Sequence, residues 1–152
     1  MQVGHLPLAL SIATYDWNPK TVALCVGMHW LPNVDSLVVK AGFAKPEFHC
    51  TVTHTVLFAV LVSGVVALIS PHYAVFTFVA IVAHYAADIG STVGLPLFWP
   101  VYPKQLTLAL FKDTGYWGWD MYIGYYKQPM AWVLEGAVTA FFIYRLFVIG
   151  VL

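Results

Sequence analysis

Charged residues are scarce in this chain. They make up 9% of its 152 residues, compared with about 25% in soluble globular proteins. Hydrophobic residues make up 61%, and the mean hydropathy is +0.77. This composition is that of an integral membrane protein, so membrane lipids are its expected surroundings.

An excess of basic residues is absent as well. Seven Lys and Arg residues balance seven Asp and Glu residues, and no basic run occurs. Because binding to a phosphate backbone requires a basic surface, we expect no nucleic-acid partner.

Cysteine is rare, and the first residues carry no basic leader. Cys25 and Cys50 lack the CxxC spacing of a metal site, and as small hydrophobic residues they need no disulfide. The segment 1–13 contains neither Lys nor Arg, so we do not expect a cleaved secretory signal. Without an internal repeat or linker, residues 1–152 are predicted to form one membrane domain.

Apolar runs of two lengths predict an all-α fold. The runs at 3–14 and 21–31 are shorter than the roughly 20 residues that cross a bilayer, and the segment 15–20 between them has turn composition. We expect these two short runs to form a helical hairpin or a re-entrant pair. Three longer runs predict transmembrane helices, at residues 53–70, 73–90 and 130–152.

Two segments are predicted to lie at the membrane surface. The chain leaves the second short run at residues 31–35, and the polar segment 40–47 is expected to be a loop. Residues 91–128 are rich in Trp and Tyr, which favour the headgroup region, so we predict an aromatic-rich interfacial segment there.

His84 and Asp88 are the ionisable pair around which a site is predicted. They are four residues apart, so they share one helix face at the end of an apolar run, where an unpaired charge is costly. Because only a short turn at residues 71–72 separates the helices at 53–70 and 73–90, these helices are expected to be antiparallel. The start of the first and the end of the second therefore lie at one level.

Four more side chains are expected to reach this level. His49 and His54 flank the start of the first long helix, Asp35 enters from the preceding loop, and His5 enters from the first short run. Imidazole nitrogens and carboxylate oxygens without a thiolate are the ligands expected for Zn²⁺ or a similar divalent ion in a catalytic site. Such a site keeps a position for a water molecule that the ion activates.

The other ionisable residues of the apolar segments have simpler interpretations. His29 and His72 are interpreted as interfacial residues, with His72 at the opposite face of the membrane. Glu135 is interpreted first as a structural residue, with a ligand or base near the cluster and a contact to a neighbouring subunit as alternatives. Arg145 lies about 15 Å further along the helix, too far to pair with Glu135, and is expected to extend to the interface.

Four elements of the sequence resemble the YdjM-like family of inner-membrane proteins, whose members are regarded as metal-dependent hydrolases. The segment HCTVTHT at 49–55 resembles the H-R-G-x-T-H-S signature of that family. The other three elements occur in the family's order over residues 4–100, as Gly4-His5, PNVD at 32–35, and His84-x-x-x-Asp88 followed by GLPLFWP at 94–100. The C-terminal part, 101–152, carries no such motif.

The resemblance implies a set of metal ligands or their supports. The H-x-x-x-D element is also similar to one in zinc-dependent phospholipase C and P1 nuclease. Asn33 stands where the family has its first Asp, and Cys50 replaces an arginine that would clamp a phosphate through two hydrogen bonds. The residues implied are His5, Asp35, His49, His54, His84 and Asp88.

Two functions of different classes are consistent with this site. The first is metal-dependent hydrolysis of a phosphoester or lipid at the membrane surface, with Asp35 as a further ligand or general base and Asp35 and His49 as candidate catalytic residues. In this hypothesis the ion, expected to be Zn²⁺, is held by His49, His54, His84 and Asp88. The second function is a non-catalytic membrane subunit that keeps the fold and supports a larger complex of protein partners. The replaced arginine and the short chain favour the subunit, whereas the retained His and Asp set favours the hydrolase.

The distribution of lysines predicts the orientation in the membrane. Five lysines lie on the predicted histidine side of the long helices, whereas the turn at 70–72 has neither Lys nor Arg. By the positive-inside rule, we expect an inner-membrane protein whose metal-site side faces the cytoplasm and whose C-terminus lies outside. The five residues are Lys40, Lys45, Lys104, Lys112 and Lys127.

A reporter fusion tests this orientation. A reporter fused at residue 71 should be active outside the cytoplasm, and one fused at residue 104 should be active inside it. The reason is that segments rich in lysine remain on the cytoplasmic side of the membrane. Cytoplasmic activity of the residue-71 fusion would contradict the predicted topology.

Overall fold

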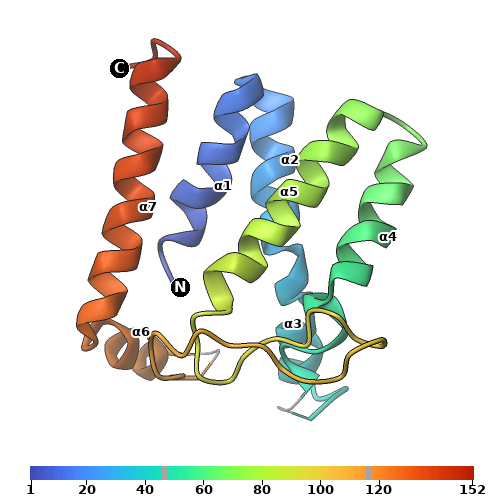
Figure 1. Ribbon diagram of the computed structural model, residues 1–152, viewed down its shortest axis with the longest axis vertical. Coiled ribbons are helices and arrows are strands. Elements are labelled where there is room, and N and C mark those ends of the chain that lie inside the picture. The colour runs from blue at the N-terminus through green and yellow to red at the C-terminus, as the bar shows by residue number, and fades with distance from the viewer. Residues whose placement is uncertain (46–47, 116–117) are drawn as a thin grey trace.

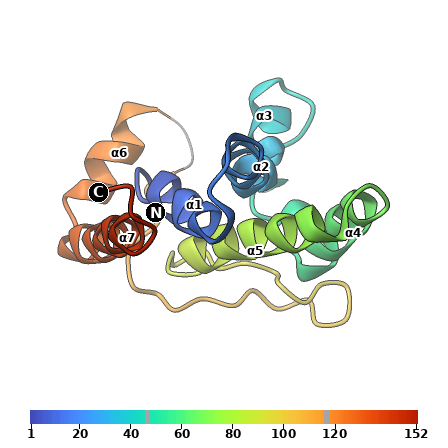
Figure 2. The same cartoon turned by 90° about the horizontal axis from the view of Figure 1, so that it is seen from above.

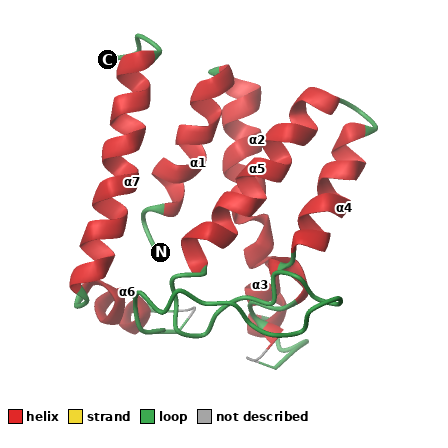
Figure 3. Ribbon diagram, in the orientation of Figure 1, coloured by secondary structure: helices red, strands yellow, loops and turns green. Residues whose placement is uncertain are grey.

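The computed structural model describes residues 1–45, 48–115 and 118–152, and every regular element among them is a helix (Figure 3). The predicted all-α class is therefore confirmed. Within this described part, β-type pairing is limited to two isolated bridges in the loops, one between Ser91 and Phe111 and one between Leu95 and Leu106.

Five helices stand side by side, and two shorter helices and a long segment gather at their lower end (Figure 1). The upright helices are α1 (His5–Ala13), α2 (Pro19–Trp30), α4 (Val56–Ala67), α5 (Pro71–Asp88) and α7 (Pro129–Val148). At the lower end lie α3 (Val34–Lys40), α6 (Trp119–Tyr126) and the long segment between α5 and α6. Three short 3₁₀ turns complete the described helical elements: η1 (Thr14–Asp16), η2 (Leu31–Asn33) and η4 (Val52–His54).

Two helical hairpins form the scaffold. In the first, Asn18 caps α2 by accepting hydrogen bonds from the backbone N–H groups of Lys20 and Thr21, and Pro19 occupies the first turn. In the second, the Ser70 side chain caps α5 by accepting from the backbone N–H of Tyr73, and the short connection makes α4 and α5 antiparallel neighbours. The predicted turn at 15–20 and the predicted antiparallel pair are both confirmed. Figure 2 shows α1, α5 and α4 in a row, with α2 on one flank.

The prediction of three transmembrane helices was wrong. Among the described residues, two segments are long and apolar enough to cross a membrane, Pro19–Lys40 and Pro129–Val148. The predicted helix at 53–70 contains only the 12 residues of α4, because Thr55 caps the helix and residues 52–54 form a 3₁₀ turn. α5 has 18 residues, but polar residues such as His72 and His84 lie near its ends.

The prediction that Asp35 enters from a loop was also wrong. Pro32 lies at the start of η2, where its missing N–H group costs no hydrogen bond, and the chain continues directly into α3. Asp35 therefore lies in the first turn of α3 and not in a loop. Lys40 ends α3, and the predicted surface loop follows it, with Pro46 and Glu47 outside the described residues.

Polar contacts hold α7 against the other helices at both ends. Glu135 accepts hydrogen bonds from the backbone of Gln2 at 2.7 Å and from the Tyr126 hydroxyl at 2.6 Å. Toward the opposite end, Arg145 donates to the Thr14 hydroxyl and lies 4.0 Å from the ring centre of Tyr15. Both charged residues of α7 are thus paired within the chain, which supports the structural interpretation of Glu135.

The segment after α5 crosses the lower end of the helices in an extended form (Figure 1). It folds back on itself where Leu95 and Leu106 exchange backbone hydrogen bonds of 2.9 and 2.8 Å. Leu95 is buried against Ile81 and Tyr85 of α5. The aromatic-rich segment thus packs against the helical core through some of its apolar residues. Tyr116 and Trp117 of this segment lie outside the described residues.

Gly94 allows this close return of the chain, so its replacement should destabilise the protein. Its φ is +76°, and a Cβ atom there would lie 2.8 Å from the carbonyl oxygen of Leu106. We expect Gly94→Ala to lower the free energy of unfolding by about 1–3 kcal/mol, measured by denaturant unfolding in detergent. Gly136→Ala on the exposed side of α7 is the control, since no atom lies within 4 Å of its Cβ position. Equal stability of the two variants would contradict this role.

Candidate metal centre

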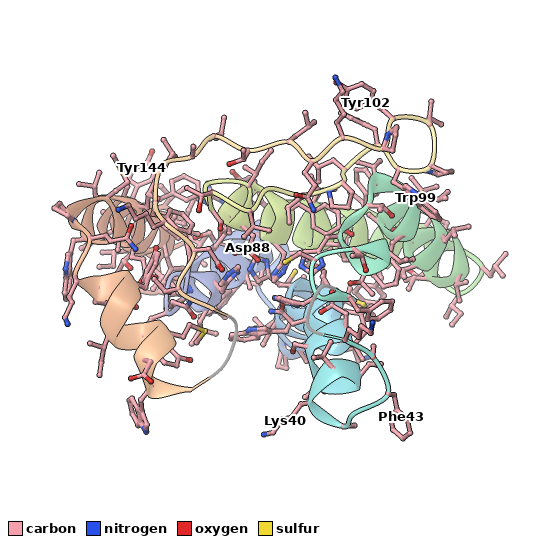
Figure 4. All side chains as sticks on the ribbon, turned by 90° about the horizontal axis from the view of Figure 1, so that it is seen from below. Lys40, Phe43, Asp88, Trp99, Tyr102 and Tyr144 are labelled. Carbon is pink, nitrogen blue, oxygen red and sulfur yellow. The ribbon has the colours of Figure 1, made fainter. Side chains whose placement is uncertain are left out.

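The lower ends of four helices bring the buried histidines together. His5 begins α1, His29 lies in the last turn of α2, His54 precedes α4, and His84 lies in the last turns of α5. All four are buried, with at most 5% of their surface exposed. Figure 4 looks onto this end and shows Asp88 near its centre. The structure places His54, His84 and Asp88 at the same end of the antiparallel helices, as predicted.

Asp35 organises one side of the cluster. Its Oδ1 atom accepts a hydrogen bond from Nδ1 of His49 at 2.8 Å. Its Oδ2 atom accepts from the backbone N–H of Cys50 at 2.8 Å and from the Thr53 hydroxyl at 2.9 Å, and lies 3.3 Å from Nδ1 of His54. Asp35 therefore supports His54 from behind, and the structure places neither Asp35 nor His49 in the groups with metal-ligand spacing.

These bonds fix the tautomer of His54. The Thr53 hydroxyl donates its proton to Asp35, so toward Nδ1 of His54, 3.1 Å away, it can only accept. Nδ1 of His54 therefore carries the proton, and Nε2 carries a lone pair. Burial lowers the pKa of His54, which keeps the ring in the neutral form that binds metals.

Nε2 of His54 faces the other members of the first ligand group. It lies 3.3 Å from Nε2 of His84, and that nitrogen lies 3.1 Å from Oδ2 of Asp88. In a tetrahedral zinc site with bonds of about 2.0–2.1 Å, neighbouring ligand atoms are about 3.3 Å apart. His54, His84 and Asp88 thus have the donor types and spacing of a three-ligand zinc site, in which Asp35 is the outer carboxylate that orients His54.

A hydroxyl group anchors the two halves of this site. Tyr85, next to His84 on α5, donates its phenolic proton toward the carbonyl oxygens of Thr53 and Thr55, at 2.8 and 3.0 Å. These carbonyls flank His54. The position of His54 is therefore tied directly to the helix that carries His84 and Asp88.

His29 belongs to the cluster, although its sequence context was interpreted as interfacial. Its Nδ1 donates to the carbonyl oxygen of Ala80 at 3.0 Å, and its Nε2 lies 2.9 Å from Nδ1 of His5. A signal for this existed in the sequence: Thr21, Cys25 and His29 are spaced by four residues, and all three are completely buried. Two polar residues, Thr21 and His29, on one face of an apolar helix indicate that this face is turned toward the protein interior.

His72 lies at the opposite end of α5, as its predicted position requires. It is exposed and pairs with Asp16 at 2.8 Å. It has no contact with the cluster among the interactions of the described residues, so five of the six histidines meet at the lower end.

A cavity of about 1140 Å³ opens beside the cluster. His5, His49 and Asp88 line its inner part, and α3, α6 and the extended segment form its walls. Cys50 also lines it, at the position where the resembling family has an arginine. Burial raises the pKa of the Cys50 thiol, so this thiol stays protonated and is not expected to act as a ligand or nucleophile. The apolar walls of the cavity include Trp30, Leu37, Trp119, Met121 and Tyr122.

Comparison with known proteins gives one family. The model of the YdjM inner membrane protein family matches residues 3–152. No curated protein and no solved structure matches the chain. The family match and the two apolar segments indicate a membrane location. Because the match covers nearly the whole chain and includes all of the clustered residues, the protein belongs to the YdjM inner membrane protein family.

Proposed function

We propose that this protein is a membrane-bound, metal-dependent hydrolase whose ion is held by His54, His84 and Asp88. The observation that carries the proposal is the convergence of two imidazoles and a carboxylate at ligand spacing, with a lone pair of His54 directed at the other two groups. The N-terminal ammonium group of Met1 pairs with Oδ1 of Asp88 at 3.1 Å, so the imidazole lone pairs and Oδ2 of Asp88 are the groups left for a metal ion.

The residues around this trio have separate roles in the proposal. A bound divalent ion would supply a water molecule whose pKa is lowered to about 7. Asp35 holds His54 in the tautomer that binds the ion. His49 lines the cavity and pairs with Asp35 through Nδ1. In this proposal His49 takes a proton from the nucleophile, and Asp35 stabilises the charged ring.

The cavity favours an amphiphilic phosphoester or lipid substrate. It lies at the lower end of the helices and combines apolar walls with polar residues, and we propose that this end lies where the bilayer meets water. Lys112 lines the same cavity and is exposed, so it offers a cation near the site although the family's arginine is replaced by Cys50. We propose that this end faces the cytoplasm of the inner membrane, because the lysine-bearing segments lie there.

Metal analysis of the purified protein is the first test. We expect about one or two zinc ions per chain in the detergent-solubilised protein, and their loss in a His84→Ala/Asp88→Ala variant, because this variant removes two of the three ligands. Elemental analysis gives the content, and His72→Ala, which alters a distant exposed histidine, is the control. Absence of metal from the wild-type protein, purified without chelators, would contradict the hydrolase and favour the non-catalytic subunit.

The outer carboxylate gives a second prediction. Asp35→Asn should weaken zinc binding about 10–100-fold. A neutral amide accepts a weaker hydrogen bond from Nδ1 of His54 than a carboxylate does, and it does not hold the ring in the metal-binding tautomer. Titration with a competing chelator measures the affinity, and Asp16→Asn, which alters a carboxylate that also pairs with a histidine, is the matched control. An unchanged affinity in a folded Asp35→Asn protein would show that Asp35 does not support the ion.

A further inference from the structure

We propose a second metal site, formed by His5, His29 and His84, beside the first. The proposal rests on the proposed function in one respect, because His84 takes part in both sites. His5, His29 and His84 also form a group at ligand spacing, and their ligand atoms all lie within 4.8 Å of one another.

The hydrogen bonds of His29 leave a lone pair at the centre of this group. A carbonyl oxygen can only accept, so Nδ1 of His29 must donate its proton to Ala80. In the neutral ring, Nε2 therefore carries a lone pair, and it points at Nδ1 of His5, 2.9 Å away.

His5 presents a second lone pair to the same point. Its Nε2 lies 3.1 Å from Oδ1 of Asp88, and a carboxylate oxygen accepts the proton there. Nδ1 of a neutral His5 then has no proton. Two lone pairs facing each other across 2.9 Å repel, so a cation is required between His5 and His29, either a metal ion or an extra proton on one of the rings.

The unused nitrogen of His84 favours a metal ion over the proton. Nε2 of His84 serves the first site, beside His54 and Asp88. Nδ1 of His84 is buried, and no hydrogen-bond partner for it is present within the described ranges 1–45, 48–115 and 118–152. A buried polar atom without a partner is costly. Because Nε2 faces the first site, Nδ1 is the nitrogen that His84 would offer to an ion beside His5 and His29, whereas a proton shared by those two rings would leave Nδ1 without a partner.

The ring contacts bring the three histidines close enough for this arrangement. The ring centres of His5 and His29 are 5.1 Å apart, those of His29 and His84 are 5.3 Å apart, and those of His5 and His84 are 4.7 Å apart. His84 would thus bind one ion through each ring nitrogen. Binding of the second ion to the neutral ring displaces its remaining proton to solvent and leaves an imidazolate bridge.

Zinc stoichiometry of selected variants tests the second site. The full-length protein in detergent is stripped with a chelator, reloaded with Zn²⁺ and analysed for metal. We expect about two ions per chain in the wild type, about one in His29→Ala and about one in His54→Ala, because each variant removes a ligand of only one site. His72→Ala is the control and should retain about two. Thermal unfolding of each variant shows that it is folded, and His29→Gln replaces His29→Ala if the latter does not fold.

Copper provides a readout that depends on the bridge. With Cu²⁺ as the probe, magnetic coupling of two ions through the ring of His84 should reduce the electron paramagnetic resonance signal of the wild type. The single ion of His29→Ala should give the full signal of an isolated centre. A wild type that binds one zinc ion, retained in His29→Ala, would overturn the second site and leave the proposed function standing. A wild type that binds no zinc would overturn both.

Discussion

The buried histidines and aspartates of this protein are in contact with one another, and the rest of the structure depends on that constraint. In an apolar bundle, a polar group that loses water must find a partner within the protein. Here a continuous series of contacts runs from His49 through Asp35 to His54, then through His84 and Asp88 to His5 and His29. Its members come from five different segments, so the series fixes where those segments meet.

The short helices follow from this requirement. α1 has nine residues and α4 has 12, fewer than a bilayer-spanning helix needs. His5 is the first residue of α1 and His54 lies just before α4, so both histidines still reach the same level. α2 and α5 reach that level with their C-terminal turns. Two hairpins with turns at the far end place two helix starts and two helix ends at one depth.

The departures from the family pattern become understandable in the structure. Cys50 has a positive φ of 60°, and its backbone N–H binds Asp35, so the backbone of this position has a structural role that does not depend on its side chain. The side chain lines the cavity. Replacement of the family's arginine therefore changes the cavity wall while the support of His54 remains intact.

The sequence by itself determined the helical class, the two turns and the pairing of His54 with His84 and Asp88. Local signals suffice for these features: a proline and a capping residue define a turn, and a short turn forces two helices to be antiparallel. The tertiary structure alone decided where the helices begin and end, the position of Asp35 behind His54, and the inclusion of His29 in the cluster. These features depend on contacts between residues that are distant in the sequence, such as His29 with Ala80. They also depend on Pro32, which lies in the first turn of η2 and does not interrupt the path into α3. A polar stripe indicates which face of a helix is buried, but only the packing of the other helices decides which groups that face meets.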